Sequence, residues 1–205
     1  MNTTSLIDVA ILTPLIAIIG VLAFNRKPNM REAVSLIAGV ILLLVNLKLY
    51  SSFNQGEALS RHWLEILPGL NLSFRVDALG LLFGLVASLL WPVTTLYAIG
   101  YMRGHNEDHQ TRFYVCFAIA IAAVMAIAYA ENLFTLFIFY EMLSLCTYPL
   151  VTHAGTEKAK QGGRVYLGIL MGTSIAFFLP AIIVTWLVAG SLDFQQGGIF
   201  PAQTP

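Results

Sequence analysis

One acidic residue, Glu141, lies near the middle of a stretch that is otherwise apolar enough to cross a lipid bilayer. The stretch runs from Asn132 to His153 and reads NLFTLFIFYEMLSLCTYPLVTH. An ionised carboxylate at that depth costs about 3 kcal/mol on insertion scales, so such residues usually face a bundle interior or a water-filled cavity. The chemistry open to a lone buried carboxyl is to hold a proton, because burial favours its neutral form and a nearby cation favours its charged form.

The helix face that carries Glu141 is polar on one side of it and aromatic on the other. Phe137 lies four residues before it, and three residues with hydroxyl groups follow it at helical spacing: Ser144, Tyr148 and Thr152. A hydrated path to Glu141 would therefore open from the half of the span after it, where Pro149 frees a backbone carbonyl. His153 stands at the mouth of this path, either as a proton relay or simply solvated.

Two hydroxyl residues in the last span, Thr173 and Ser174, could line the same path or bond to their own backbone carbonyls, and we weigh the two readings evenly. Glu141 also has a structural alternative, in which the protonated acid forms a hydrogen bond across a helix interface. The chain has no phosphate loop, dinucleotide fingerprint, iron–sulfur cysteine cluster or haem histidine pair, so we expect no cofactor and no catalytic site. Cys116 and Cys146 lack metal-ligand spacing and are expected to be buried apolar side chains.

The composition indicates an all-α protein that crosses the membrane several times. Hydrophobic residues make up 58% of the 205 residues and charged residues 11%, against about 25% charged in soluble domains. The net charge of zero gives no indication of nucleic-acid binding. Six apolar runs are long enough to span a bilayer: Leu6–Phe24, Ala33–Tyr50, Asp77–Tyr101, Phe113–Ala130, Asn132–His153 and Arg164–Ala189.

The placement of Lys and Arg predicts the orientation. Three connections on one side, including the loop expected at 154–163, hold eight such residues: Arg26, Lys27, Arg31, Arg103, Arg112, Lys158, Lys160 and Arg164. The other side has Arg61 and Arg75, together with Lys48, which we interpret as a snorkelling anchor in preference to a functional lysine. The positive-inside rule therefore places the N-terminus outside the inner (cytoplasmic) membrane.

The outer loop 51–76 differs from the other connections. Apolar and polar residues alternate from Leu70 to Val76 after the pair Pro68-Gly69, which predicts a small β-hairpin, with an irregular loop as the alternative. Asp77 follows, and we expect it to cap a helix, an ion path being the less favoured role. Glu131 is expected to be solvated at the outer surface.

Small residues recur at four-residue spacing and predict tightly packed helix faces. They fall in three sets: Gly80, Gly84 and Ser88; Ala118, Ala122, Ala126 and Ala130; Gly168 and Gly172. Pro180 is expected to kink the last span. We interpret residues 1–112 as a peripheral packing region, 113–189 as a channel region, and 190–205 as a polar outer tail.

Four runs of the chain, FRVDALGLLFGL, LYAIGYM, NLFTLFIFYEMLSLCTYPLVTH and GRVYLGILMGTS, resemble the proton-translocating antiporter-like subunits. This family includes large membrane subunits of complex I, of Mrp-type cation/proton antiporters, D-type above all, and of membrane-bound hydrogenases. The resemblance implies about fourteen helices with two inverted five-helix repeats. It also implies that Glu141 is the key acid of the fifth helix and pairs with a lysine on the seventh.

The sequence contains no seventh span. Lys158 and Lys160 are expected in a loop, and Lys48 lies on the wrong helix. We therefore expect the N-terminal portion of a family member, in which another chain or segment supplies the lysine. The leading hypothesis is a subunit of a multisubunit H⁺ or Na⁺/H⁺ exchanger in the bilayer. The alternatives are a proton-pumping subunit of a complex I-like NADH:quinone oxidoreductase or hydrogenase, and a non-conducting scaffold.

Overall fold

The computed structural model describes residues 5–67 and 69–200. This part of the chain contains six helical spans that are long and apolar enough to cross a membrane. The first five are α1 (Ser5–Ala23), α2 (Pro28–Asn54), α3 (Ala78–Gly104), α4 (Gln110–Ala128) and α5 (Leu133–Val151). The sixth runs from Glu157 to Ala189 and comprises α6 (Glu157–Thr173), a π-helical turn η1 (Ser174–Phe178) and α7 (Leu179–Ala189). The predicted helical membrane fold with six spans is confirmed.

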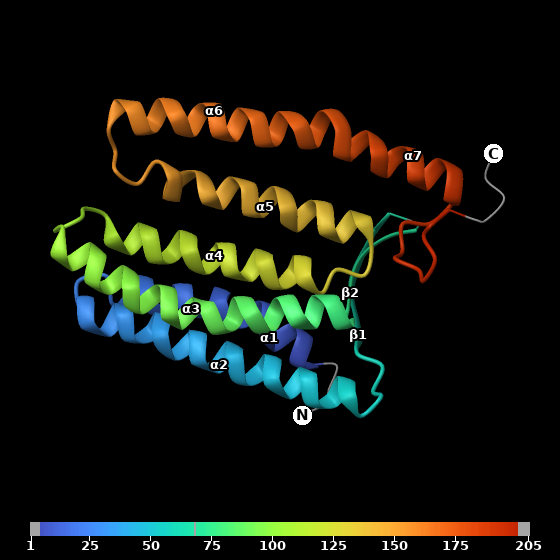
Figure 1. Ribbon diagram of the computed structural model, residues 1–205, viewed down its shortest axis with the longest axis horizontal. Coiled ribbons are helices and arrows are strands. Elements are labelled where there is room, and N and C mark those ends of the chain that lie inside the picture. The colour runs from blue at the N-terminus through green and yellow to red at the C-terminus, as the bar shows by residue number, and fades with distance from the viewer. Residues whose placement is uncertain (1–4, 68, 201–205) are drawn as a thin grey trace.

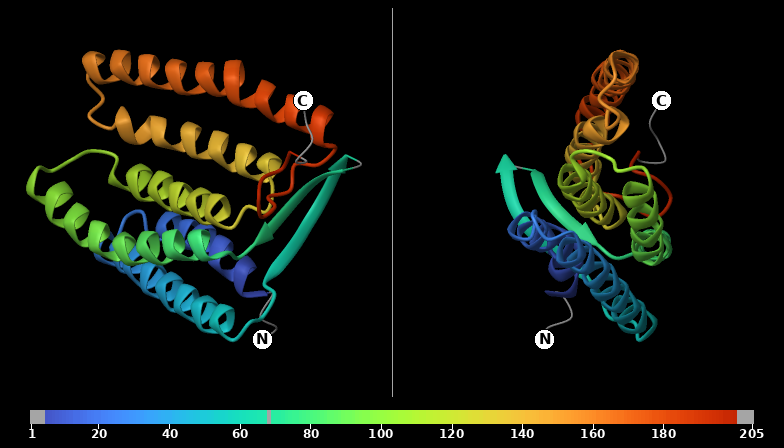
Figure 2. Two further views of the ribbon diagram at one scale, coloured as in Figure 1. Left: turned by 45° about the vertical axis from the view of Figure 1, so that its right-hand side comes forward. Right: turned by 90° about the vertical axis from the view of Figure 1, so that its left-hand side faces the viewer.

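The first four helices form a bundle, and the last two spans are stacked on one side of it (Figures 1 and 2). Helix α1 packs against α2 and α4, α5 packs on α4, and α6 packs on α5. The largest fully buried side chains lie in the bundle and at its junction with the hairpin, among them Trp91, Tyr129, Phe74 and Leu42.

Small residues bring α3 and α4 into direct contact. A methyl group added to Gly80 would overlap the carbonyl oxygen of Ala128, and one added to Gly84 would overlap the hydroxyl of Tyr129. Close backbone approach of this kind is how helices associate in lipid. The predicted packing face of α3 is confirmed. Gly168 and Gly172 are exposed, with open space beside them within the described residues, so the prediction that they form a packing pair is wrong for this part of the chain.

The outer loop contains the predicted β-hairpin. Strand β1 (Ser60–Leu67) pairs antiparallel with β2 (Leu70–Arg75), and two register shifts interrupt the ladder. Gly69 has a φ of 85°, a conformation that glycine adopts at little cost in tight turns, whereas Pro68 lies outside the described residues. After β2, the Asp77 carboxylate accepts a hydrogen bond of 2.6 Å from the Gly80 amide, so Asp77 is the N-cap of α3.

Hydrogen bonds fasten the hairpin to the start of α5. The Asn132 side chain accepts from the Thr135 amide at 2.7 Å and donates to Ser73 Oγ at 2.8 Å. The Glu131 carboxylate lies 3.7 Å from Arg75, so the expectation that Glu131 is merely solvated is wrong.

The predicted outer tail also contributes to this junction. The Leu133 amide donates to Leu192 O, and the Phe194 amide donates to Glu131 O, both at 3.0 Å. The beginning of the tail therefore returns to the bundle surface as part of the folded structure. Residues 201–205 of the predicted tail lie outside the described residues.

The connection expected at 154–163 is shorter than predicted, because α6 begins at Glu157. Thr156 caps the helix by accepting from the Ala159 amide at 3.1 Å, and Glu157 in the first turn favours a helix N-terminus. Lys158 and Lys160 therefore lie on a helix, and their placement in a loop is wrong.

The connections α1–α2, α3–α4 and α5–α6 meet at one end of the molecule, opposite the hairpin (Figure 1), and the eight Lys and Arg residues lie in these connections or in the adjoining helix ends. We call this the basic end.

Candidate functional site

The carboxylate of Glu141 lies at the interface between α5 and the sixth span. Its Oε1 accepts a hydrogen bond from the Ser174 hydroxyl, while its Oε2 is buried without a hydrogen-bond partner among the described residues. None of the salt bridges within residues 5–67 and 69–200 includes Glu141. One oxygen of the carboxylate is therefore held by a hydrogen bond, and the other has an unused capacity to bind a proton or a cation.

The residue that holds Glu141 begins an irregular helical turn. In η1 the Leu179 amide donates to Ser174 O, five residues back. Pro180 has no amide hydrogen, and its ring would clash with the carbonyl of Ala176 in a regular α-helix, which gives a physical reason for the wider turn. The disturbance predicted at Pro180 thus takes the form of a π-turn just before it. Such turns occur frequently at functional sites.

Aromatic rings pack beside Glu141 on the hairpin side. Phe178 in η1 makes edge contacts with Phe137 and with Tyr140, with ring centroids 5.6 and 6.0 Å apart. Sequence reasoning found Phe137 from its helical spacing but missed Phe178. The available signal was that Phe178 lies four residues after Ser174, on the same helix face.

The predicted hydroxyl residues differ in what they bind. Ser144 is buried and donates to Tyr140 O at 3.0 Å, and Thr152 donates to Tyr148 O at 2.9 Å. Thr173 is exposed and donates to Ile169 O at 2.8 Å. Of the two interpretations weighed evenly for Thr173 and Ser174, Thr173 follows the bond to its own backbone. Ser174 instead donates to the Glu141 carboxylate.

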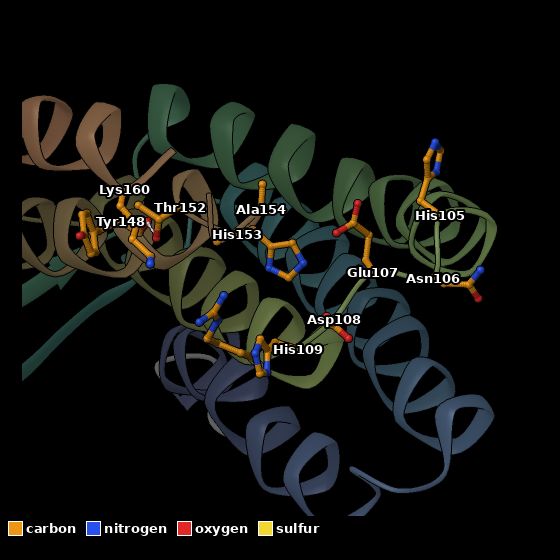
Figure 3. A pocket seen from close by; sticks show the side chains of 12 residues that line it. His105, Asn106, Glu107, Asp108, His109, Tyr148, Thr152, His153, Ala154 and Lys160 are labelled. Atoms are coloured by element: carbon orange, nitrogen blue, oxygen red, sulfur yellow. Dashed lines mark hydrogen bonds between the residues drawn. The ribbon is translucent and has the colours of Figure 1, made fainter. Parts of the chain in front are cut away.

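A cavity of about 640 Å³ opens at the basic end (Figure 3). It is lined by His105, Asn106, Glu107, Asp108, His109, Arg112, Tyr148, Thr152, His153, Ala154, Gly155 and Lys160. Three of the predicted path residues, Tyr148, Thr152 and His153, are therefore brought together at one cavity. Glu141 and Ser144 are not among its lining residues, and Glu141 precedes Tyr148 by seven residues, a rise of about 10 Å along the helix.

Most of the other lining side chains come from the connection between α3 and α4. Sequence reasoning missed them because they are about forty residues from the path in sequence, and only the packing of α4 on α5 brings them close. Within residues 5–67 and 69–200, no group of three or more His, Cys, Asp or Glu is arranged to hold a metal ion.

His153 is the least satisfied side chain of the cavity wall. Both ring nitrogens are buried without a hydrogen-bond partner in the described residues, and the ring lies edge-on to Phe113 at 5.6 Å. Burial lowers the pKa of His153 below its ordinary value of 6.5, and the positive charge of Arg112 lowers it further, whereas Glu107 raises it. The neutral imidazole is therefore favoured, with one nitrogen able to donate and the other able to accept.

A glycine allows α6 to lie directly on the path residues. A methyl group added to Gly163 would overlap the Thr152 side chain and come within 3.2 Å of Tyr148 Cε2. Sequence reasoning placed Gly163 in a loop and missed this contact.

Two further predicted residues lie away from the Glu141 path: Asp77 is at the start of α3, and Lys48 is exposed on α2.

Comparison with known proteins agrees with this architecture. A family model described as NADH:quinone oxidoreductase/Mrp antiporter, TM, matches residues 130–200. A second, described as NADH-Ubiquinone oxidoreductase (complex I), chain 5 N-terminus, matches residues 63–114. The membrane-bound sulfane sulfur reductase, an archaeal respiratory membrane complex, contains a chain with the same fold, with a TM-score of 0.73 at 18% identity over 91% of this chain and 28% of that one.

Two curated relatives extend the match over nearly the whole chain. The A1 subunit of a Na(+)/H(+) antiporter from Staphylococcus haemolyticus is 28% identical over 96% of this chain and 26% of its own length. The A/B subunit of a "Probable K(+)/H(+) antiporter" from Rhizobium meliloti is 29% identical over 93% of this chain and 19% of its own. The chain thus spans about a quarter or less of the length of these relatives.

The fold and the matches define a multi-pass membrane protein of the antiporter-like class. More particularly, the chain belongs to the family of membrane subunits shared by Mrp antiporters and complex I-type oxidoreductases. The family recognised from the sequence motifs is confirmed. The Staphylococcus and Rhizobium relatives are A-type subunits, whereas the motifs pointed first to the D type.

Proposed function

We propose that this chain is part of a subunit that moves protons across the membrane in exchange for Na⁺, with Glu141 as the proton carrier. The observation that supports this most directly is the state of its carboxylate: Oε1 is held by Ser174, and Oε2 is buried and unpaired among the described residues. The same helix face continues to Tyr148 and Thr152, which line the basic-end cavity. Proton supply would reach Glu141 along this face.

The unpaired oxygen of Glu141 explains why a proton or a cation would move to this carboxylate. A buried acceptor without a partner costs about 1–3 kcal/mol, and more when charged, so Glu141 gains by taking up a proton or by meeting a cation. The Ser174 hydroxyl donates to the ionised form and holds the carboxylate in place while the proton is absent. A lysine from another chain or segment, as the family resemblance implies, would displace the proton when it approaches and readmit it when it leaves.

The environment follows from the same reading. Under the positive-inside rule the basic end faces the cytoplasm and the hairpin lies outside, and we propose the inner membrane as the location of the chain. Its partners are then the lipid bilayer and other membrane subunits of one complex. Residues 113–189 form the channel region and residues 1–112 the packing region.

A second candidate is a proton-pumping role in a redox complex. It is favoured by the match of residues 130–200 to a family model that includes NADH:quinone oxidoreductases. The proton step at Glu141 would be the same, and electron transfer in partner subunits would drive it. A third candidate, a non-conducting scaffold, draws on the absence of a cation beside Glu141 in the described residues.

The decisive variant is Glu141→Gln in the assembled complex, with cation-driven proton movement followed by a pH-sensitive dye in inverted membrane vesicles. We expect loss of exchange, at least about 100-fold, because the amide cannot carry the proton. Glu57→Gln, an exposed acid near the hairpin end, is the matched control and should leave exchange unchanged. Unchanged exchange in Glu141→Gln would reject the carrier role and favour the scaffold.

A pair of neighbouring hydroxyl variants tests the support of the carboxylate. Ser174→Ala should reduce exchange about tenfold, since it removes a hydrogen bond to a charged group. Thr173→Ala, which removes only an exposed bond to its own backbone, should be near wild type.

Co-purification separates the first two candidate functions. Partner subunits that hold flavin or iron–sulfur clusters indicate redox coupling, and small membrane subunits alone indicate exchange.

A further inference from the structure

The basic-end cavity holds more titratable side chains than a simple water path requires. Three of the chain's four histidines line it, together with two acids and two cations: His105, His109, His153, Glu107, Asp108, Arg112 and Lys160. The proposed path to Glu141 uses only His153 from this set. The remaining groups gather where the path meets the surface.

The connection that carries most of these groups is held in a defined shape. Gln110 donates to the carbonyl of Glu107 at 3.1 Å and accepts from the buried Arg31 guanidinium at 2.7 Å. Asn106 and His109 have φ angles of 51° and 55°, in the left-handed region, which Asn and His adopt more often than most other non-glycine residues. Such conformations persist where the surrounding structure enforces them, and they are common at functional sites.

Glu107 and His153 share a special position within this cavity. Both also line a neighbouring, mainly apolar groove of about 440 Å³ between the ends of α3, α4 and α5. The two side chains thus stand at the junction of the polar cavity and the apolar groove. Glu107 lies close enough for its charge to act on the His153 ring, and within the described residues no salt bridge neutralises it.

We propose that Glu107 and His153 form a proton-loading site that collects protons from the cytoplasm and delivers them to the path beginning at Tyr148. This inference rests on the proposed function of Glu141. A proton from hydronium or a buffer acid binds a carboxylate oxygen of Glu107 and then transfers, through water in the cavity, to the unprotonated nitrogen of His153. The other ring nitrogen releases its proton to water beside Tyr148, and the ring resets, so that one proton moves and only O–H and N–H bonds change.

The surroundings of His153 suit such a relay. The groups that face it across the two spaces come from α3, the α3–α4 connection, α4, α5 and α6: Tyr97, Tyr101, His105, Glu107, Asp108, His109, Arg112, Tyr148 and Lys160. The cations among them oppose a lasting charge on the ring, whereas Glu107 attracts the proton to the junction. A proton therefore passes through His153 without being trapped there.

The experiment compares Glu107→Gln, His153→Phe and the control Glu57→Gln in the assembled complex, in vesicles, with cation/proton exchange measured at pH 6 and pH 8. Loss of a proton donor should slow exchange about tenfold or more at pH 8, where protons are scarce, and much less at pH 6. Imidazole or formate at tens of millimolar (about 50 mM) should restore the pH 8 rate, because a small buffer can enter the cavity and replace the missing group. Glu107→Asp should keep most of the activity.

Two results would overturn the proton-loading site. One is wild-type exchange at pH 8 in both Glu107→Gln and His153→Phe. The other is an equal loss at both pH values without rescue by buffer, which would indicate a merely structural role. In either case a loss of exchange in Glu141→Gln would still support the proposed function, whereas unchanged exchange in Glu141→Gln would reject that function itself.

Discussion

The bundle of α1–α4 and the pair formed by α5 and the sixth span are built on different principles. The residues buried in α4 are mainly alanines, with Tyr114, Ile121 and Met125, and α4 packs against α1 and α3. Those buried in α5 are Thr135, Ser144 and Cys146, and the one buried in α6 is Gly163. The bundle is held by close apolar packing, whereas the contacts between α5 and the sixth span include Gly163 against Thr152 and the hydrogen bond from Ser174 to Glu141. The comparison separates a scaffold from the region suited to proton chemistry.

Two buried polar side chains, Asn46 in the bundle and Glu141 in the pair, differ in a related way. In the bundle, Asn46 donates to Leu42 O at 3.0 Å and accepts from the Tyr129 hydroxyl, so both ends of its amide are satisfied. In the pair, Glu141 has one oxygen without a partner among the described residues. A satisfied buried group fixes one structure, and an unsatisfied one can change its state. This contrast is why we assign stability to the first and function to the second.

The largest expected effect tests the scaffold. Glu32 is buried beside the buried Arg31 and also pairs with the half-exposed Arg103, so Glu32→Gln leaves the buried Arg31 guanidinium without its carboxylate. We expect the free energy of unfolding to fall by about 3–5 kcal/mol, measured as a lower Tm and yield of folded protein in detergent. The control is Glu157→Gln, which breaks only an exposed pair with Lys160 and should leave the Tm nearly unchanged. Equal effects of the two would contradict the assignment of Glu32 to the bundle core.

Glycine variants test the next largest difference. Gly80→Ala places a methyl group onto the Ala128 carbonyl, so α3 and α4 must separate, at about 1–3 kcal/mol for overpacking. Gly168→Ala meets open space in the described residues and should leave the Tm unchanged. Thermal unfolding of the two variants side by side measures this. A stable Gly80→Ala protein would show that the bundle is less tightly packed than its small residues indicate.

A third pair of variants sharpens the functional side of the comparison. Gly163→Ala pushes α6 away from Thr152 and Tyr148, at an overpacking cost of about 1 kcal/mol or slightly more. This shift should weaken the contact of Ser174 with Glu141 and lower the rate of exchange several-fold. The Tm should change little, because few residues of this pair are buried. Gly162→Ala, one residue earlier and without neighbours within 4 Å among the described residues, is the control. A lower Tm of Gly163→Ala with unchanged exchange would show that the pair of α5 and the sixth span contributes to stability and not to function.

The smallest expected effect depends on pH. Burial holds the pKa of His153 below 6.5 in the folded protein, so the unfolded chain binds more protons between the two pKa values. Stability is therefore fully present above about pH 6.5 and falls as the pH drops through this window. The Tm of the wild-type protein should decrease more between pH 7.5 and 5.5 than that of His153→Phe. His62→Phe, an exposed residue of the hairpin, should retain the wild-type slope.

Local signals predicted much of the fold. Apolar runs gave the six spans, because a helix that crosses a bilayer needs about twenty apolar residues in sequence. Alternation from Leu70 to Val76 gave the second strand, and the position of Asp77 gave a helix cap. The same local reasoning failed at 154–163, where a short basic stretch was interpreted as a loop although Thr156 caps a helix within it. It failed again at Gly168, because spacing shows which residues share a face and not what covers it.

The sequence by itself determined that Glu141 is an acid at bilayer depth, with hydroxyl groups on one side along its helix, because these properties depend only on order and helical period. The tertiary structure alone decided which oxygen of Glu141 is held, that Ser174 and not Thr173 holds it, and that Glu107 and His153 line one cavity. The physical reason is that these contacts join residues far apart in the chain. Their geometry depends on the packing of α4, α5 and the sixth span, and on the π-turn before Pro180.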